Sequence, residues 1–504
     1  MKSYRAWNPG QSFLLPPSPL EWLPEGHLAY FVLELVETID LSAITEAIQA
    51  KDARGERPYP PAMLVALLLY GYAVGVFSSR KIERATHEDV AFRVLAGGAH
   101  PHFTTINEFR NTYRAEYAKV FKHVLRLCRA AGMVSLGHIA IDGTKVNANA
   151  SKHKAMSYER MQAEEQRLSA EVEELLKKAE AIDRDEDRQY GVGKAAEDLP
   201  TELQFRETRL KRVKEAKAAL EREAAETRAQ TLRENAEGQR EVAGDGTVDP
   251  IERKKAATRA AKAEKQADEL TKRDSDDDPK GGAGTSEDEL PKHRVPVERD
   301  GSPKPNAQRN FTDPDSRIMM RNTEVAQAYN AQIAVDSSEQ VIVAECVSNQ
   351  APDAEYFEPM LERVVKNCEG DAPVVVTADN GYLSKAAIDA SRRCGVNAHI
   401  SCGHGEKPKA PVTQEPATPA QKARAAMAKK LATPTGKAIY ARRKTVAEPP
   451  FGQIKQARGF RRFSMRGVAK VRDEWTLVCL THNVLKLFRK LGSLEILALR
   501  VATS

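Results

Sequence analysis

A charged segment of about 150 residues separates two apolar parts of this chain. Residues 156–305 are rich in Ala, Glu, Lys and Asp, whereas short β-branched runs lie on both sides of the segment. Such a composition leaves little surface with which to bury a core. The flanking runs are therefore expected to fold together in a mixed α+β protein, from which the charged segment protrudes.

Two helices are expected in the first half of this segment. Apolar side chains alternate spacings of four and three residues within 156–185, as in paired helices, at Leu168, Val172, Leu175, Ala179 and Ile182. A second helix is expected to begin at Pro200, after a break at 189–193. The pattern predicts an antiparallel helical hairpin. The composition of residues 225–305 instead predicts a frayed helix followed by disorder.

The apolar runs outside the segment predict a mixed sheet. Three antiparallel strands are expected from HIAIDGTKVNANA and from the two halves of AYNAQIAVDSSEQVIVAECVSN, which a turn at 336–339 joins. A helix, the strand PVVVTADNGY, a second helix and the strand VNAHIS follow. This order is that of an RNase H-like fold, in which the ends of the first and fourth strands meet.

Three carboxylates are candidate catalytic and metal-binding residues. Asp142 and Asp379 each close a short apolar strand, and Glu448 lies in a basic, helix-like segment ahead of Lys455. Hard cations prefer carboxylate oxygens, and two of them about 3.5–4 Å apart can assist both the attacking and the leaving oxygen of a phosphodiester. We predict two Mg²⁺ ions here, which Mn²⁺ can replace. An Asp at a strand end is also common without any such role.

Other candidate sites are weaker. Asp313-Pro314-Asp315 is a rival metal site, but it is also ordinary turn chemistry. The six cysteines are scattered and include no CxxC pair, so no zinc site is predicted and reduced thiols of an intracellular protein are expected.

Basic residues gather around Glu448. Between residues 437 and 472 there are eleven Lys or Arg and one acid. This density fits a phosphate backbone as partner, although a solvated basic helix is the alternative. Pro449 and Pro450 favour a position for Glu448 at the start of a helix, where proline is tolerated.

The same residues resemble a known family. Tyr440, Arg443, Glu448 and Lys455, followed by GFRRFSMRGVAKV, are similar to the Y-x2-R-x3-E-x6-K motif of insertion-sequence DDE transposases. IAIDGTKVNANASK and TADNGYLS resemble the segments around the first two Asp of that family. The spacing departs by one, because four residues separate Arg443 from Glu448. LPEGHLAYFVLELVETID resembles the InsH-type helical amino-terminal domain, and the charged insertion resembles the eleven-eighty-two type subgroup.

The resemblance implies an activity and its partners. Metal-bound water would cleave DNA at the terminal inverted repeats of a mobile element, and the freed 3′ hydroxyl would attack target DNA, in a homo-oligomeric complex. Lys455 would pair with a phosphate near the cut, and Tyr440 and Arg443 would position DNA. Further DNA contacts are expected from Lys444, Arg461 and Arg462. A structure-specific nuclease and a domesticated DNA-binding protein without catalysis remain the alternatives.

Four regions follow from this reading. They are a helical domain at 1–132 that recognises DNA ends, a first strand region at 133–155, the insertion at 156–305, and the rest of the RNase H-like domain at 306–504. DNA contact is possible in the first region, against simple solvation, at Arg80, Lys81, Arg84, Arg110 and Arg114.

Several stretches of the chain bear on location and packing. The sixteen apolar residues 62–77 are too short to span a membrane and predict a buried helix. No signal peptide is evident, so a cytoplasmic, nucleoid-associated bacterial protein is expected. In the last apolar helix, His482 and Asn483 are expected to have core or capping roles rather than contacts with the site. For the helical insertion, an interaction or scaffold role and direct DNA contact both stay open.

Overall fold

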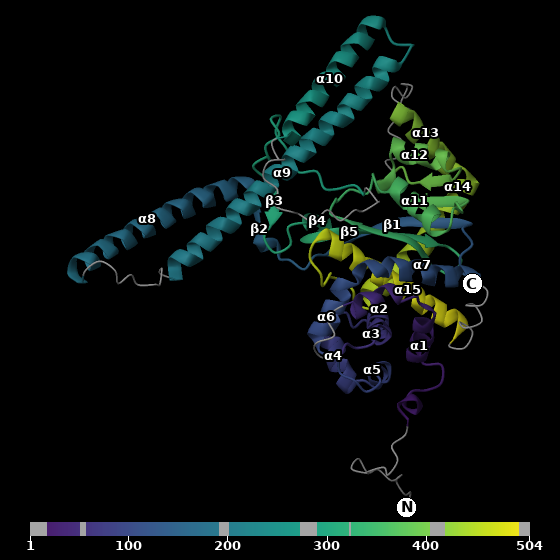
Figure 1. Ribbon diagram of the computed structural model, residues 1–504. Helices are drawn as coiled ribbons and strands as arrows, with labels where there is room; N and C mark the ends of the chain where they lie inside the picture. The colour runs from purple at the N-terminus through teal and green to yellow at the C-terminus, as the bar shows by residue number, and fades with distance from the viewer. Residues whose placement is uncertain are drawn as a thin grey trace, which may run out of the picture.

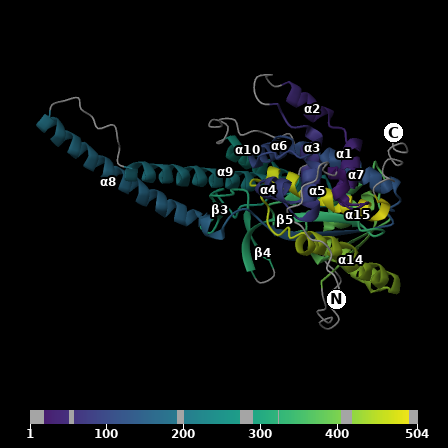
Figure 2. The same cartoon turned by 90° about the horizontal axis from the view of Figure 1, so that it is seen from below.

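The computed structural model describes residues 18–50, 57–190, 201–272, 290–321, 324–403 and 419–492. Helices at the amino-terminal side pack against a mixed sheet, and long helical arms extend away from the sheet (Figure 1). The view from below shows how far the arm that contains α8 extends beyond the rest of the protein (Figure 2).

The central sheet has the expected mixed order. Its strands are β1 (His138–Asn147), β4 (Arg317–Arg321), β5 (Glu324–Asp336), β6 (Ile342–Ser348), β7 (Val375–Ala378) and β8 (Asn397–Ile400). β5 pairs antiparallel with β1 and with β6, whereas β7 is parallel to both β1 and β8. The order β6-β5-β1-β7-β8 confirms the RNase H-like arrangement. β4 is an addition that pairs with the first residues of β5.

The helices from the carboxyl-terminal part of the chain flank the sheet. They are α11 (Phe357–Asn367), α12 (Lys385–Arg393), α13 (Pro419–Ala432), α14 (Pro434–Gly452) and α15 (Val468–Leu491), with a π-helical turn η5 (Gln453–Ala457) after α14. α14 packs near β1, β7 and β8, and α15 packs on β6 and also on the amino-terminal helices. As expected, His482 and Asn483 on α15 are buried and hydrogen-bond the backbone at Gln340 and Ile342.

The amino-terminal part is helical, as predicted. It contains α1 (Leu28–Thr38), α2 (Ser42–Gln49), α3 (Pro61–Val74), α4 (Ser79–Glu88), α5 (Val90–Leu95), α6 (Phe103–Thr112) and α7 (Tyr117–Ala130). Residues 64–73 of α3 are all buried, which confirms the predicted core helix. Within the described ranges, no helix is by itself long and apolar enough to cross a membrane, although the bent pair α3 and α4 passes that test together.

The amino-terminal helices and the sheet share one apolar core. A single cluster of buried side chains runs from α1 through α3 and α7 to the strands and α15. Arg458 is buried at this junction, where its guanidinium donates to Thr481 Oγ1 and to backbone carbonyls of Tyr72 and Val478. Gly75 has φ +88°, and a Cβ there would lie 2.6 Å from the Arg458 carbonyl. Close backbone contact therefore joins the two parts.

The described part of the insertion contains three helices, α8 (Tyr158–Tyr190), α9 (Thr201–Gly244) and α10 (Pro250–Lys272). α8 and the first half of α9 form the predicted hairpin, with Met161, Leu168, Val213 and Leu220 in a small apolar cluster. Ion pairs with Arg309 and Arg317 hold Glu223, in the middle of α9, against the short two-stranded sheet β2 (Ala155–Ser157) and β3 (Gln308–Asn310) and against β4.

The expected fraying after residue 225 is not observed. α9 continues to Gly244, and α10 packs along its second half (Figure 1). The interface uses small side chains, since buried residues on the two helices include Ala229, Ala236, Ala256, Ala260 and Ala267. Alanine has the highest helix propensity and allows helix axes to approach closely, so few large apolar residues were needed. Of the segment expected to be disordered, residues 273–289 lie outside the described residues, whereas 290–305 have buried side chains at Leu290 and Val295 and a β-bridge between Val297 and Pro303.

Candidate functional site

Strand register brings Asp142 and Asp379 together. In the parallel ladder between β1 and β7, Ile141 is the partner of Ala378; Asp142 is the next residue of β1, and Asp379 directly follows the last residue of β7. Burial raises the pKa of Asp142 to about 6, the positive charge of Arg443 opposes this rise, and the negative charge of Asp379 adds to it. Burial also raises the pKa of Asp379. The two carboxylates therefore form a partly desolvated negative pair that favours a cation.

Arg443 supplies positive charge to this pair. Its Nη1 lies 3.2 Å from Oδ2 of Asp142, and only 11% of its side chain is exposed. Its charge opposes the rise in the pKa of both aspartates. Tyr440, one turn earlier on α14, hydrogen-bonds the Arg443 side chain. Two of the residues predicted to position DNA thus lie at the aspartates.

Lys455 reaches the same strand from the π-helical turn. Its Nζ donates to Oγ1 of Thr144 and, at 3.2 Å, to the carbonyl of Lys145. Both acceptors lie on β1 within three residues of Asp142. Single π-helical turns often occur at functional sites, because the extra residue redirects side chains. The turn here places Lys455 beside the aspartate strand.

Glu448 does not join Asp142 and Asp379. It is exposed near the end of α14, while Ala447 is buried on the face that carries Arg443. An α-helix turns by about 100° per residue, so a residue five positions after Arg443 points about 140° away from it, whereas one four positions after it points only about 40° away. Among the described residues, no three His, Cys, Asp or Glu side chains are placed to hold one metal ion.

The expected helix start at Glu448 is wrong. α14 begins at Pro434 and continues through both Pro449 and Pro450. Pro449 has no N–H to offer the carbonyl of Thr445, four residues earlier. That carbonyl instead accepts a hydrogen bond from Nε2 of Gln340, at 3.0 Å. The contact replaces the helical bond that Pro449 cannot make.

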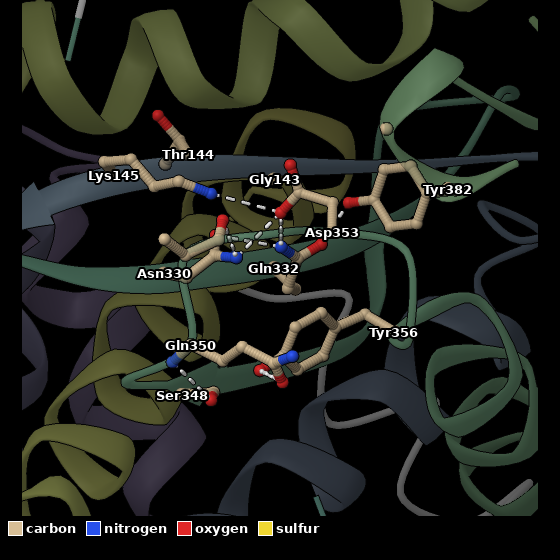
Figure 3. Close-up of polar contacts among 12 residues, drawn as sticks. Gly143, Thr144, Lys145, Asn330, Gln332, Ser348, Gln350, Asp353, Tyr356 and Tyr382 are labelled. Atoms are coloured by element: carbon tan, nitrogen blue, oxygen red, sulfur yellow. Dashed lines mark hydrogen bonds and ion pairs between the residues drawn. The ribbon is translucent and has the colours of Figure 1, made fainter. Parts of the chain in front are cut away.

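Asp353 is a third carboxylate near the pair, and the sequence reasoning missed it. It follows β6, and its Oδ1 accepts from Lys145 Nζ at 3.1 Å, Asn330 Nδ2 at 2.7 Å and Gln332 Nε2 at 2.8 Å (Figure 3). Tyr382, in the turn after Asp379, donates to Oε1 of Gln332. The signal was available: AYNAQIAVD carries two polar residues on one face of a strand whose remaining residues are mostly apolar.

This network has no room for a side chain at position 143. A Cβ on Gly143 would lie 2.3 Å from Nε2 of Gln332, far inside contact distance. Asn330 and Gln332 are fully buried, so their amides depend on one another and on Asp353 for partners. The network therefore ties β1, β5 and the turn after Asp379 into one rigid unit.

The predicted DNA contacts divide into exposed and buried groups. Lys444, Arg461 and Arg462 are exposed. Arg110 is buried and donates to the hydroxyl of Tyr72 and the carbonyl of Phe77, so the proposal of a DNA contact there is wrong. Its contacts with Tyr72 on α3 and with the loop after α3 hold that guanidinium inside the core.

The other basic candidates of the amino-terminal part have protein partners or are exposed. Arg114 pairs with Asp473, Arg84 pairs with Glu88, and Arg80 lies over the ring of Phe103. Lys81 is exposed.

The rival metal site at Asp313 and Asp315 has a structural role. Oδ1 of Asp313 accepts from the hydroxyl of Tyr329 and from the N–H of Gly467, and Oδ2 of Asp315 accepts from the N–H of Val468. These contacts satisfy backbone donors at the start of α15, the usual task of a capping carboxylate.

The aspartate pair fits a divalent cation by its chemistry. Both side chains offer hard carboxylate oxygens, and the guanidinium of Arg443 already lies beside Asp142 as a positive counter-charge. The fit is incomplete, since Glu448 is not brought into the group. Asp142 and Asp379 are thus the ligands that the geometry supports.

Comparisons with known proteins match two parts of the chain. A protein-family model described as "Transposase DDE domain" matches residues 377–488, and one described as "Transposase domain (DUF772)" matches residues 18–112. The first range includes Asp379, Arg443, Glu448 and Lys455. No curated protein and no solved structure matches the chain. The two matched domains support a transposase function in general.

Proposed function

We propose that this protein is a DDE transposase of an insertion sequence, which cleaves DNA at the ends of the element and joins those ends to target DNA. The observation that carries the proposal is the β1–β7 register, which sets Asp142 beside Asp379. Tyr440, Arg443 and Lys455 converge on the same place from a segment that the DDE family model matches.

Asp142 and Asp379 would hold Mg²⁺, and Mn²⁺ could replace it. A bound divalent ion polarises phosphoryl oxygens and lowers the pKa of water, and a pair of ions can serve both oxygens of a displacement. Arg443 is placed to neutralise the aspartates before an ion binds. Lys455, which contacts β1, would meet a phosphate there. Lys444, Arg461 and Arg462 would hold the DNA backbone on the exposed side.

Glu448 is retained as a proposed third ligand that must turn toward the aspartates. In this structure it lies outside the pair, exposed near the end of α14. The terminal inverted repeats and the target would be the DNA partners, and we propose a homo-oligomer acting at the bacterial nucleoid in the cytoplasm.

The test is marker transfer in cells. A marker flanked by the native element ends is supplied with the unaltered protein, with Asp142→Asn, or with the matched surface variant Asp389→Asn on α12. We expect transfer with the unaltered protein and with Asp389→Asn, and a loss on the order of 10³-fold or more with Asp142→Asn, because a ligand of the reacting centre is gone.

Purified proteins separate the alternatives. Retained binding to end DNA by Asp142→Asn would show that the loss is chemical rather than structural. Mg²⁺-dependent nicking without transfer in any assay would favour a structure-specific nuclease. Binding without nicking or transfer by the unaltered protein would favour a DNA-binding protein without catalysis.

A further inference from the structure

The α10 helix presents more basic than acidic side chains to solvent. Two of its four acids, Glu264 and Asp268, pair with α9, at Arg240 (2.5 Å) and at Arg233 (3.3 Å). Five basic side chains are exposed, at Lys254, Lys255, Arg259, Lys262 and Lys265, together with the acids Glu252 and Glu269. The outer face of α10 therefore has a net positive charge.

Few partners neutralise this outer face. Lys255 pairs with Glu252 at 3.3 Å, whereas Lys254, Arg259, Lys262 and Lys265 form no ion pair with any residue that the structure describes. The other arm differs. α8 contains eleven acids and six basic residues, and its acids pair with basic residues of α9 at Arg206, Arg209 and Lys217.

The spacing of the basic residues makes a continuous ridge. Lys255, Arg259 and Lys262 follow one another at intervals of four and three residues, which places them on one side of the helix. At 1.5 Å per residue, the ridge from Lys254 to Lys265 is about 16 Å long, and each strand of duplex DNA carries one phosphate per 3.4 Å of axis. The ridge can thus follow several consecutive phosphates.

The side chains that lie between the basic residues are small. Ala257, Thr258 and Ala261 are exposed between them, and an open hollow of about 690 Å³ runs along this side of the helix. Small side chains allow a helix to approach a backbone closely while the longer Lys and Arg side chains reach around it.

We propose that the outer face of α10, formed by Lys254, Lys255, Arg259, Lys262 and Lys265, binds the phosphate backbone of duplex DNA without sequence preference. The arm on which it lies extends away from the sheet that carries Asp142 (Figure 1). The surface would therefore hold DNA at a distance from the reacting phosphodiester. The proposal rests on the proposed function only in taking DNA as the ligand.

The test compares two triple variants of the full-length protein. Lys254→Gln, Arg259→Gln and Lys262→Gln are combined in one, and Lys211→Gln, Arg212→Gln and Lys214→Gln on the exposed surface of α9 in the other. Both lose three positive charges from an exposed helix of the insertion. Fluorescence anisotropy measures binding to a labelled 30-base-pair duplex that lacks element ends, over a range of salt concentrations.

We expect the α10 variant alone to change the salt dependence. Each lost phosphate contact lowers the slope of log affinity against log salt by about 0.9, so the slope should fall by up to about 2.7, with a loss of affinity of about 10–100-fold near 0.1 M salt. The α9 variant should stay within about twofold of the unaltered protein.

Two outcomes would overturn the proposal. One is an unchanged slope in the α10 variant. The other is an equal loss in both variants, which would indicate a response to net charge rather than to this face. Far-UV circular dichroism checks that the helices remain intact. The measurement needs no catalysis, so an inactive Asp142 site and a failed α10 surface are distinguished.

Discussion

The charged side chains at the aspartate pair and on the α10 arm lie in opposite environments, the first buried and the second exposed to solvent. Around Asp142 the polar groups are buried and bonded to one another, with Asp353 accepting three hydrogen bonds at a single oxygen. On α10 the basic side chains are exposed and mostly unpaired. Burial makes the first region sensitive to small changes, because an unpaired polar group cannot turn to water for a partner. Because the charges on α10 are solvated, substitutions there should change the free energy of unfolding little, whereas any binding to this face should depend on the salt concentration.

The largest effect on stability is expected from Asp353→Ala. The change removes one of the two acceptors of each buried amide group, Asn330 Nδ2 and Gln332 Nε2, and also the partner of Lys145, at a cost of about 2–4 kcal/mol. Urea unfolding of the full-length protein measures it. Asp371→Ala, which removes an exposed carboxylate paired with Arg129, is the control and should cost less than about 1 kcal/mol. Equal losses of unfolding free energy in the two variants would show that the Asp353 network contributes no more to stability than an exposed ion pair.

A pH dependence follows from Asp142. Burial raises its pKa from 3.8 to about 6 in the folded protein, so between these values the folded state binds more protons than the unfolded state. Stability is therefore lost as pH rises from about 4 to 6, by up to about 3 kcal/mol for a shift of about two units.

The measurement is the difference in unfolding free energy between the unaltered protein and Asp142→Asn, taken at pH 4 and pH 7 in EDTA. The unaltered protein should weaken relative to the variant at pH 7, because asparagine does not titrate. A difference that stays constant with pH would contradict the burial of this carboxyl.

Gly143→Ala tests whether the packing of Gln332 against β1 leaves room for a side chain at position 143. The added methyl would collide with Gln332, and the cost expected from overpacking is about 1–3 kcal/mol. Gly137→Ala, just before β1, is the matched control. A Cβ there would meet only Ser135 Oγ, at an ordinary 3.5 Å. The prediction fails if both variants unfold at the same urea concentration.

The smallest effect is expected on the arm. Glu264→Gln breaks the ion pair with Arg240. The Arg240 side chain is 64% exposed and the Glu264 side chain 34% exposed, and exposed ion pairs contribute less than about 1 kcal/mol to stability. Thermal unfolding followed by circular dichroism measures it. A loss as large as that of Asp353→Ala would mean that the arm is held together by its charges rather than by its alanine interface.

Local patterns in the sequence were enough for the elements and for two of the site residues. Alternating and β-branched runs indicated the strands that carry Asp142 and Asp379 close together, although β1 continues to Asn147 instead of ending at Asp142 as expected. The apolar spacing indicated the α8–α9 hairpin and the buried α3. These patterns are readable because side-chain period follows directly from backbone geometry. The order of strands then implied that the two aspartates meet.

The tertiary structure alone decided which face each residue presents. Whether Glu448 turns toward the aspartates depends on the packing of α14, and whether the helix passes Pro449 depends on Gln340, more than a hundred residues away. Asp353 joins the site through partners on other strands, Arg110 is buried by packing between helices, and α10 is ordered by alanines that meet α9. Contacts between distant segments fix these features, so no local period carries them.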